Sequence, residues 1–197
     1  GLMIVGFGLK DSIFAIVDIQ YGELQLYDGT VIMAEGASEG EKEEVVQKLE
    51  SEREVDGSLE GVLTQITIGN GSEWHEVYLD VPRDEKQFEK FVTLKDRKTD
   101  EKYSLKKDEV VLTEKAAKEL EVQPGDMITI RDEEKGNMEV KVGAVCENYM
   151  GHYLYMTADA YESVYGEEPD YNAVFYKTVS RTTKEAQSVG EDVLRLP

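Results

Sequence analysis

Apolar residues at the start of the chain fall at helical spacing. The apolar run Leu2 to Leu9 is followed by Ile13, Ile16 and Val17, which recur at intervals of three and four. This pattern is typical of an amphipathic helix, so we predict a helix over residues 9–20. The run has no basic segment before it and no small-residue cleavage site after it, so we do not expect it to be a signal peptide. It is either the frayed apolar end of a surface helix or the last two turns of a membrane helix.

Strand and helix patterns alternate between residues 22 and 91. A capping box at Ser38 and Glu41 marks the start of a helix. Elsewhere apolar and polar residues alternate as they do in strands, with Asn70-Gly71 as the turn between two of them. The predicted elements are a strand over 22–35, a helix over 39–53, strands over 59–68 and 74–81, and a short helix that carries Phe88 and Phe91. This order predicts a layered α+β unit.

From residue 92 onward the patterns are mostly those of short strands. Thr113 and Thr157 are predicted helix N-caps, and Gly166 is predicted to end the second of these helices. The predicted strands cover 92–95, 103–106, 110–112, 127–131, 138–145, 152–156 and 173–177, and the predicted helices cover 113–120, 157–166 and 182–194. The second half of the chain is therefore expected to be rich in β structure.

Charge excludes one class of partner. The 197 residues include 42 acidic and 22 basic side chains, which gives a net charge of −20. A polyanion is repelled by this charge unless basic residues are concentrated somewhere, so we expect no nucleic-acid partner. The single cysteine, Cys146, cannot form an internal disulfide, and two histidines are too few for a Cys/His zinc cluster.

No motif with a catalytic mechanism is visible in the sequence. Both histidines lie in strand patterns without a nucleophile elbow, and no phosphate-binding loop is present. Lys135 takes a ligand position in the acidic segment Asp132–Gly136, which breaks the calcium-loop spacing. Asn70-Gly71-Ser72 is either a glycosylation sequon or a turn. We expect no enzyme, cofactor or metal site, although a hydrolase built on paired carboxylates leaves no sequence spacing to read.

Two groups of residues are candidates for contact with a partner. The segment Lys95–Lys107 holds six basic and three acidic residues, so it is locally positive and is either a contact surface or a solvated hairpin. Seven of the eleven tyrosines lie between Tyr149 and Tyr176, and they form either an aromatic contact surface or part of the core. The candidate contact residues are Lys102, Lys106, Lys107, Tyr149, His152, Tyr153 and Tyr155.

Two stretches resemble a known family. The first runs Gly6-Phe7-Gly8-Leu9-Lys10-Asp11-Ser12-Ile13 and continues with Gln20-Tyr21-Gly22-Glu23 and Tyr27-Asp28. It resembles the point where the first transmembrane helix of FtsX-like ABC permeases enters the extracytoplasmic domain. The second, Val110-Val111-Leu112-Thr113-Glu114-Lys115-Ala116-Ala117-Lys118-Glu119-Leu120 with Val122 and Pro124-Gly125-Asp126, resembles a segment of the inserted subdomain in MacB-like ectodomains.

The resemblance implies an extracytoplasmic domain at the cell membrane, with a porter-like α/β layer and an inserted β-rich subdomain. The implied parts are a stalk helix over 1–21, a first porter-like subdomain over 22–91, the inserted subdomain over 92–178 and a return helix over 179–197. The implied partners are a cytoplasmic ABC ATPase, a second permease copy or a paired permease, and an extracytoplasmic client such as a peptide, a lipoprotein or a cell-wall factor. The implied role is to transmit ATP-driven motion to that client.

An alternative interpretation is a freestanding binding module. The helix pattern over 113–120, followed by Pro124-Gly125-Asp126 and the strand pattern over 127–131, also suits a double-psi-type barrel used for substrate recognition. This alternative leaves the apolar start of the chain unexplained.

Overall fold

The computed structural model describes residues 2–5, 13–18, 24, 26–148 and 151–194. The chain divides into two compact units, which we describe separately. Unit 1 comprises residues 1–61, 86–92 and 171–197, and unit 2 comprises residues 62–85 and 93–170. No helix in the described ranges is both long enough and apolar enough to cross a membrane.

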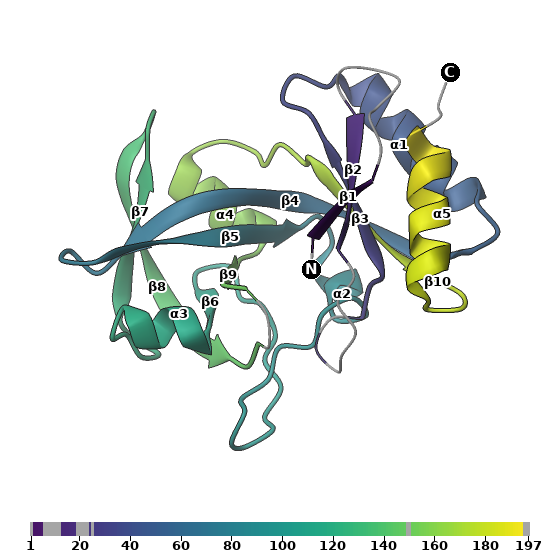
Figure 1. Cartoon of the computed structure of the whole chain (residues 1–197). Coiled ribbons are helices and arrows are strands. Elements are labelled where there is room, and N and C mark those ends of the chain that lie inside the picture. The colour runs from purple at the N-terminus through teal and green to yellow at the C-terminus, as the bar shows by residue number, and fades with distance from the viewer. Residues whose placement is uncertain (1, 6–12, 19–23, 25, 149–150, 195–197) are drawn as a thin grey trace. The chain divides into compact units, whose positions relative to one another are not determined.

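Unit 1 is an antiparallel sheet with two helices packed against it (Figure 1). The strand order is β1-β2-β3-β10-β4, and every neighbouring pair is antiparallel. The strands are β1 (Leu2–Val5), β2 (Ile13–Asp18), β3 (Gly29–Met33), β10 (Ala173–Thr178) and the first part of β4 (Val55–Gly69), and the helices are α1 (Glu39–Ser51) and α5 (Thr183–Leu194).

Caps and burial explain why these helices form. The capping box of α1 is confirmed, because Ser38 Oγ accepts a hydrogen bond from the Glu41 amide at 3.2 Å and Glu41 accepts one from the Ser38 amide at 3.4 Å. The core of unit 1 consists of Val31, Met33, Val45, Leu49, Val174, Tyr176, Ala186, Val189 and Val193. The Tyr176 hydroxyl donates to the carbonyl of Ala186 at 2.6 Å, which ties β10 to α5.

The predicted helix over residues 9–20 is wrong where the structure describes it. Residues 13–18 form β2, which pairs antiparallel with β1 so that Leu2 lies opposite Asp18. Residues 9–12 and 19–20 lie outside the described residues. Short apolar runs do not separate helix from strand by spacing, and β-branched and aromatic residues such as Ile13, Phe14 and Val17 favour a strand. The implied stalk is therefore a strand pair in its described part.

Unit 2 is a closed ring of six strands with both parallel and antiparallel pairs (Figure 1). Around the ring the strands are β4 (its residues 62–69), β5 (Trp74–Pro82), β9 (Tyr153–Tyr155), β6 (Val110–Thr113), β8 (Gly136–Cys146) and β7 (Met127–Asp132). Antiparallel pairing of β7 with β4 closes the ring, with Thr67 opposite Arg131. The β5–β9 and β6–β8 pairs are parallel. A closed ring leaves no unpaired sheet edge.

Two short helices belong to unit 2. They are α3 (Glu114–Glu119) and α4 (Ala158–Tyr165), while α2 (Glu85–Phe88) lies where the chain passes from unit 2 to unit 1. Thr157 Oγ1 caps α4 by accepting from the Ala160 amide at 3.0 Å, and Gly166 ends it in the left-handed conformation. The side chain of Thr113 accepts instead from the Tyr153 amide at 3.1 Å, so it links β6 to β9 rather than capping α3.

The implied subdomain boundaries differ from the two units. The resemblance implies that residues 62–85 lie in the first subdomain, but they belong to unit 2, where β4 pairs with β7 and β5 pairs with β9. The resemblance likewise implies that β10 lies in the inserted subdomain, but it lies in unit 1 between β3 and β4. Both differences come from long-range strand pairing, which local patterns do not encode. The fold class is α+β, as the sequence predicted.

Candidate partner-binding surface

The segment between α2 and β6 carries most of the candidate basic residues, and a tight turn shapes it. Asp96 Oδ1 accepts hydrogen bonds at 2.8 Å from the amides of both Lys98 and Thr99. Both backbone bonds lower the pKa of Asp96 because they stabilise the carboxylate, and the bond from Thr99 has the larger effect. Asp100 takes the left-handed conformation with φ at 61°. Asp and Asn tolerate this conformation best among residues with a side chain, so the sequence is suited to the turn.

Only a short ladder flanks this turn. Lys95 and Lys102 form one isolated antiparallel bridge, and the Tyr103 amide donates to the Leu94 carbonyl at 2.8 Å. The strands predicted over 92–95 and 103–106 are therefore reduced to a bridged loop in this part of the structure. Something other than strand pairing must hold the loop against the rest of unit 2.

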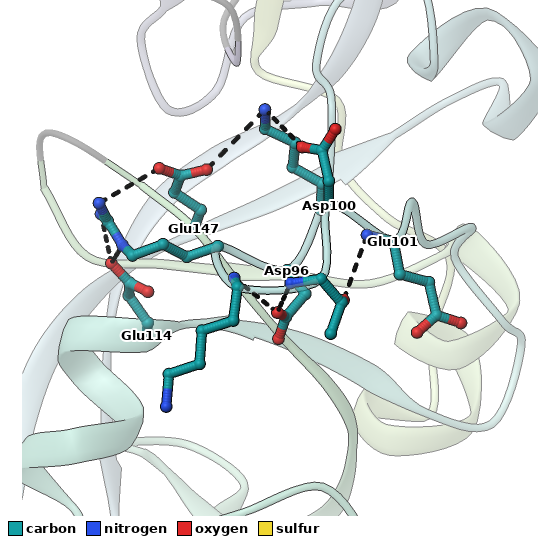
Figure 2. Close-up of polar contacts among 9 residues, drawn as sticks. Asp96, Asp100, Glu101, Glu114 and Glu147 are labelled. Atoms are coloured by element: carbon teal, nitrogen blue, oxygen red, sulfur yellow. Dashed lines mark hydrogen bonds and ion pairs between the residues drawn. The ribbon is translucent and has the colours of Figure 1, made fainter.

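A buried carboxylate holds the loop (Figure 2). The Glu147 side chain is 7% exposed and lies 3.3 Å from Arg97 Nη1 and 4.0 Å from Lys95 Nζ. Arg97 Nε also donates to Glu114 on α3 at 2.8 Å, and Lys95 Nζ lies 3.0 Å from Asp100. We call Lys95, Arg97, Asp100, Glu114 and Glu147 the clamp. It joins the loop to α3 and to the end of β8.

The clamp changes the charge that the loop presents to solvent. Arg97 and Lys95 are neutralised within unit 2, so they are not available to an acidic partner in the way that the sequence suggested. Lys102, Lys106 and Lys107 are exposed, and none of them forms an ion pair with another described residue. The positive surface predicted for this segment is thus reduced to these lysines and Lys98.

A cavity of about 300 Å³ lies beside the loop. Its lining residues are Glu101, Lys102, Tyr103, Ser104, Lys106, Glu109, Val110, Val111, Gly143 and Ala144. Val110, Val111 and Ala144 are buried, whereas Lys102, Ser104 and Lys106 are exposed. A second, more apolar cavity of about 230 Å³ shares Glu109 and Val110 and also contacts Lys107. The structure thus gathers Lys102, Lys106 and Lys107 around two neighbouring hollows.

Gly143 shapes the first cavity. The register of β6 against β8 shifts between Val110 and Val111, which lie opposite Val142 and Ala144, so Gly143 is bulged out of the ladder. A Cβ atom at Gly143 would lie 2.8 Å from the Glu109 Cβ, and closer still to its carboxylate. The glycine therefore leaves room for Glu109 to lie over β8, where Lys141 Nζ is 3.7 Å away.

The tyrosine candidates belong to the core. Tyr153 and Tyr155 are 5% and 3% exposed, and their rings stack on each other at 5.6 Å. Tyr153 also contacts the ring of Tyr78 on β5 at 5.6 Å. An aromatic contact surface at these two residues is therefore wrong, because both rings are buried and pack against other aromatic rings. His152 is half-buried, and Tyr149 lies outside the described residues.

Two titratable groups in unit 2 are buried. Asp80 on β5 is 2% exposed, and its Oδ1 has no hydrogen-bond partner among the described residues. Burial raises the pKa of Asp80 to about 8. Cys146 is 1% exposed, and burial raises the pKa of its thiol to about 12, so it stays unreactive. The described residues contain no cluster of three or more metal-ligating side chains.

The sequon has a structural explanation. Asn70 Oδ1 accepts from the amides of Ser72 and Glu73 at 2.9 Å, and Asn70 Nδ2 donates to the carbonyl of Leu120 at 2.8 Å. Its amide group therefore forms hydrogen bonds within the β4–β5 turn and links that turn to the residue after α3. The turn interpretation of Asn70-Gly71-Ser72 fits these contacts.

Comparisons with known proteins add two structural neighbours. The chain is similar to the extracellular domain of the noncanonic ABC-type transporter YknZ from Gram-positive bacteria, with 16% identity and a TM-score of 0.47, over 77% of this chain and 79% of that one. It is also similar to the periplasmic region of MacB from Actinobacillus actinomycetemcomitans, with 14% identity and a TM-score of 0.46, over 84% and 79%. No protein-family model matches the chain. No curated protein sequence matches it either.

Proposed function

We propose that this chain is the extracytoplasmic domain of an ABC transporter permease, which passes ATP-driven motion to a client outside the membrane. The proposal rests on the order in which the chain passes through the two units. The first and last elements, β1 and α5, pack together in unit 1, and unit 2 is formed by segments between them. A domain whose first and last elements pack together can be inserted between two segments of a host protein. The resemblance of residues 6–28 and 110–126 to FtsX-like and MacB-like permeases supports the same assignment.

In this proposal unit 1 receives the motion and unit 2 meets the client. The strand β2 lies between β1 and β3, so a displacement of the first residues acts on a hydrogen-bonded sheet. The chain then crosses between the units four times, near residues 61, 85, 92 and 170. The first crossing lies within the continuous strand β4. A separate cytoplasmic ATPase hydrolyses the ATP. A second permease copy or a paired permease completes the assembly.

Proline in β2 should uncouple ATP hydrolysis from the motion of unit 2. Proline lacks the amide donor of a ladder hydrogen bond, and it is not tolerated in an interior strand. We expect Ile13→Pro and Ile16→Pro, in the intact permease with its ATPase, to leave ATP hydrolysis running while motion of unit 2 is lost. The motion is read from an environment-sensitive fluorophore on Met127→Cys, since Met127 is 53% exposed.

The matched controls are Ile13→Val and Ile16→Val, which keep the amide and the β-branched shape. They should retain the ATP-dependent fluorescence change. A full change in the proline variants would contradict transmission through β2. Thermal unfolding of each variant shows whether unit 2 remains folded, so that a lost signal is assigned to coupling only in folded protein.

A freestanding substrate-recognition module is the second candidate, and the closed six-stranded ring of unit 2 favours it. Both candidates place the client on unit 2. They differ in where the chain resides, because only a permease domain must face outward from a membrane. Accessibility of the native protein from outside the cell separates them.

A further inference from the structure

We propose that the cavity beside the loop binds the free carboxylate at the C-terminus of a peptide whose last side chain is apolar. This inference deepens the proposed function, on which it rests for the idea of an extracytoplasmic client. It uses the described residues that line the cavity and the ion pair between Glu109 and Lys141 for which Gly143 leaves room.

The polar side of the cavity suits a single carboxylate. Lys102 and Lys106 line it, both are exposed, and neither forms an ion pair with another described residue. Tyr103 and Ser104 add two hydroxyl groups to the same lining. Ammonium groups and hydroxyls donate hydrogen bonds to a carboxylate, and such charge-assisted bonds are stronger than neutral ones.

The acidic residues of the lining compete only weakly. Glu109 Oε1 lies 3.7 Å from Lys141 Nζ, so its charge is balanced from the side of β8. This arrangement depends on Gly143, because any side chain at that position would push Glu109 off the strand. Glu101 is exposed, so water solvates its carboxylate. With Glu109 paired to Lys141, the lining holds two lysines against the single carboxylate of Glu101, which leaves its local charge positive.

The apolar side and the size of the cavity define the rest of the ligand. Val110, Val111 and Ala144 form a buried apolar part of the lining, which suits an aliphatic side chain. A volume of about 300 Å³ is at the lower end of the range for ligand pockets, so the cavity holds a small group rather than a long segment. The C-terminal residue of a peptide has both features, one carboxylate and one apolar side chain.

The charge of the whole chain selects against larger anions. A net charge of −20 repels nucleic acid and anionic lipid surfaces, which carry many charges over a wide area. A single carboxylate is affected much less, because salt screens charges beyond about 10 Å. At short range these lysines attract any anion. Because the whole chain repels highly charged anions, we expect them to bind a ligand of low charge in preference.

The test compares two probes on the 197-residue chain by NMR titration. One probe is acetyl-Ala-Ala-Leu with a free carboxylate, and the other is the same peptide with a C-terminal amide. We expect the acid to shift the amide signals of residues 101–106, 110–111 and 143–144, and to bind about tenfold more tightly than the amide. Equal binding of the two probes overturns the proposal.

Variants assign the binding to the cavity. The double variant Lys102→Gln with Lys106→Gln should bind the acid peptide only as weakly as the amide peptide. The control variant is Lys98→Gln, because Lys98 is an exposed lysine of the same loop that does not line the cavity. Its affinity for the acid peptide should be unchanged. Unchanged binding by the double variant overturns the proposal. Inorganic phosphate that displaces the peptide at equal concentration would show a general anion site instead and would overturn it too. None of these measurements involves ATP, so their failure is distinct from a failure of the proposed permease role.

Discussion

Replacing Asp80 with asparagine should remove a large part of the pH dependence of stability. Asp80 is 2% exposed, lies opposite Tyr155 in the β5–β9 pair, and has a carboxylate oxygen without a partner among the described residues. Burial raises its pKa to about 8 from an ordinary value of 3.8. At pH values between these two, the folded state keeps a proton that the unfolded state releases.

The sign of the effect follows from this difference. Because the folded state binds more protons, its stability falls as the pH rises from about 4 to about 8, by up to about 1.4 kcal/mol per pH unit. Above pH 8 both states are ionised at this group, and its contribution no longer changes. The amide of the Asp80→Asn variant cannot ionise, so the difference in unfolding free energy between the variant and the wild type should grow by about 3 kcal/mol between about pH 5 and about pH 7.

Urea denaturation at a series of pH values measures this difference. The matched control is Asp28→Asn in unit 1, because Asp28 is also buried but accepts hydrogen bonds from the Thr178 amide at 2.8 Å and from Arg181 Nε at 2.9 Å. That variant should lose stability instead, since it weakens a charge-assisted contact. Parallel pH profiles for wild type and Asp80→Asn would show that Asp80 is not held neutral in the folded state.

Removing Arg97 should release the loop. Arg97→Met leaves the Glu147 carboxylate, whose side chain is 7% exposed, with Lys95 at 4.0 Å as its one cationic partner among the described residues. A buried charge without a close partner is costly, although the partial exposure of Arg97 reduces the effect, so we expect a loss of about 2 kcal/mol. The double variant Arg97→Met with Glu147→Met should recover about half of this loss, because no uncompensated carboxylate is left.

Hydrogen exchange gives the local measurement for this prediction. The Tyr103 amide donates to Leu94 across the base of the loop, so its exchange should accelerate in Arg97→Met. Lys98→Met, on the same loop and outside the clamp, should change stability by less than about 0.5 kcal/mol. A loss of the same size in Lys98→Met would mean that the clamp has no special role.

Local signals in the sequence were sufficient for most elements. Ser38 and Glu41 defined the start of α1, and Thr157 and Gly166 defined both ends of α4, because caps are local contacts between residues three or four positions apart. Alternation of apolar and polar residues located β4, β5, β7 and β8. These elements were predicted to within a few residues.

Long-range pairing was not accessible from the sequence. Residues 13–18 carry an apolar pattern that fits either a helix or a strand, and pairing with β1 and β3 decides for the strand. The place of β10 in unit 1 and the closure of β7 on β4 likewise depend on partners far away in sequence, such as Val174 with Val31 and Thr67 with Arg131. Such partners leave no local signal.

The candidate site was predicted only in part. The cluster of lysines between residues 95 and 107 pointed to the right segment, and Lys102 and Lys106 do line a cavity. Glu147 could not be found, because a single glutamate at the end of a strand reads as a surface residue until Arg97 and Lys95 are seen beside it. Tyr153 and Tyr155 were misplaced because aromatic residues in a strand suit the core and a contact surface equally.

The location of the chain in the cell tests the central claim most directly. Cys146 is 1% exposed and has a raised thiol pKa, so it gives little background in thiol labelling, whereas Val179 is 66% exposed. We expect Val179→Cys, introduced into the native protein, to react with a membrane-impermeant maleimide in intact cells, and the wild type to remain unlabelled. Labelling of Val179→Cys only after the cells are lysed would contradict an outward-facing permease domain.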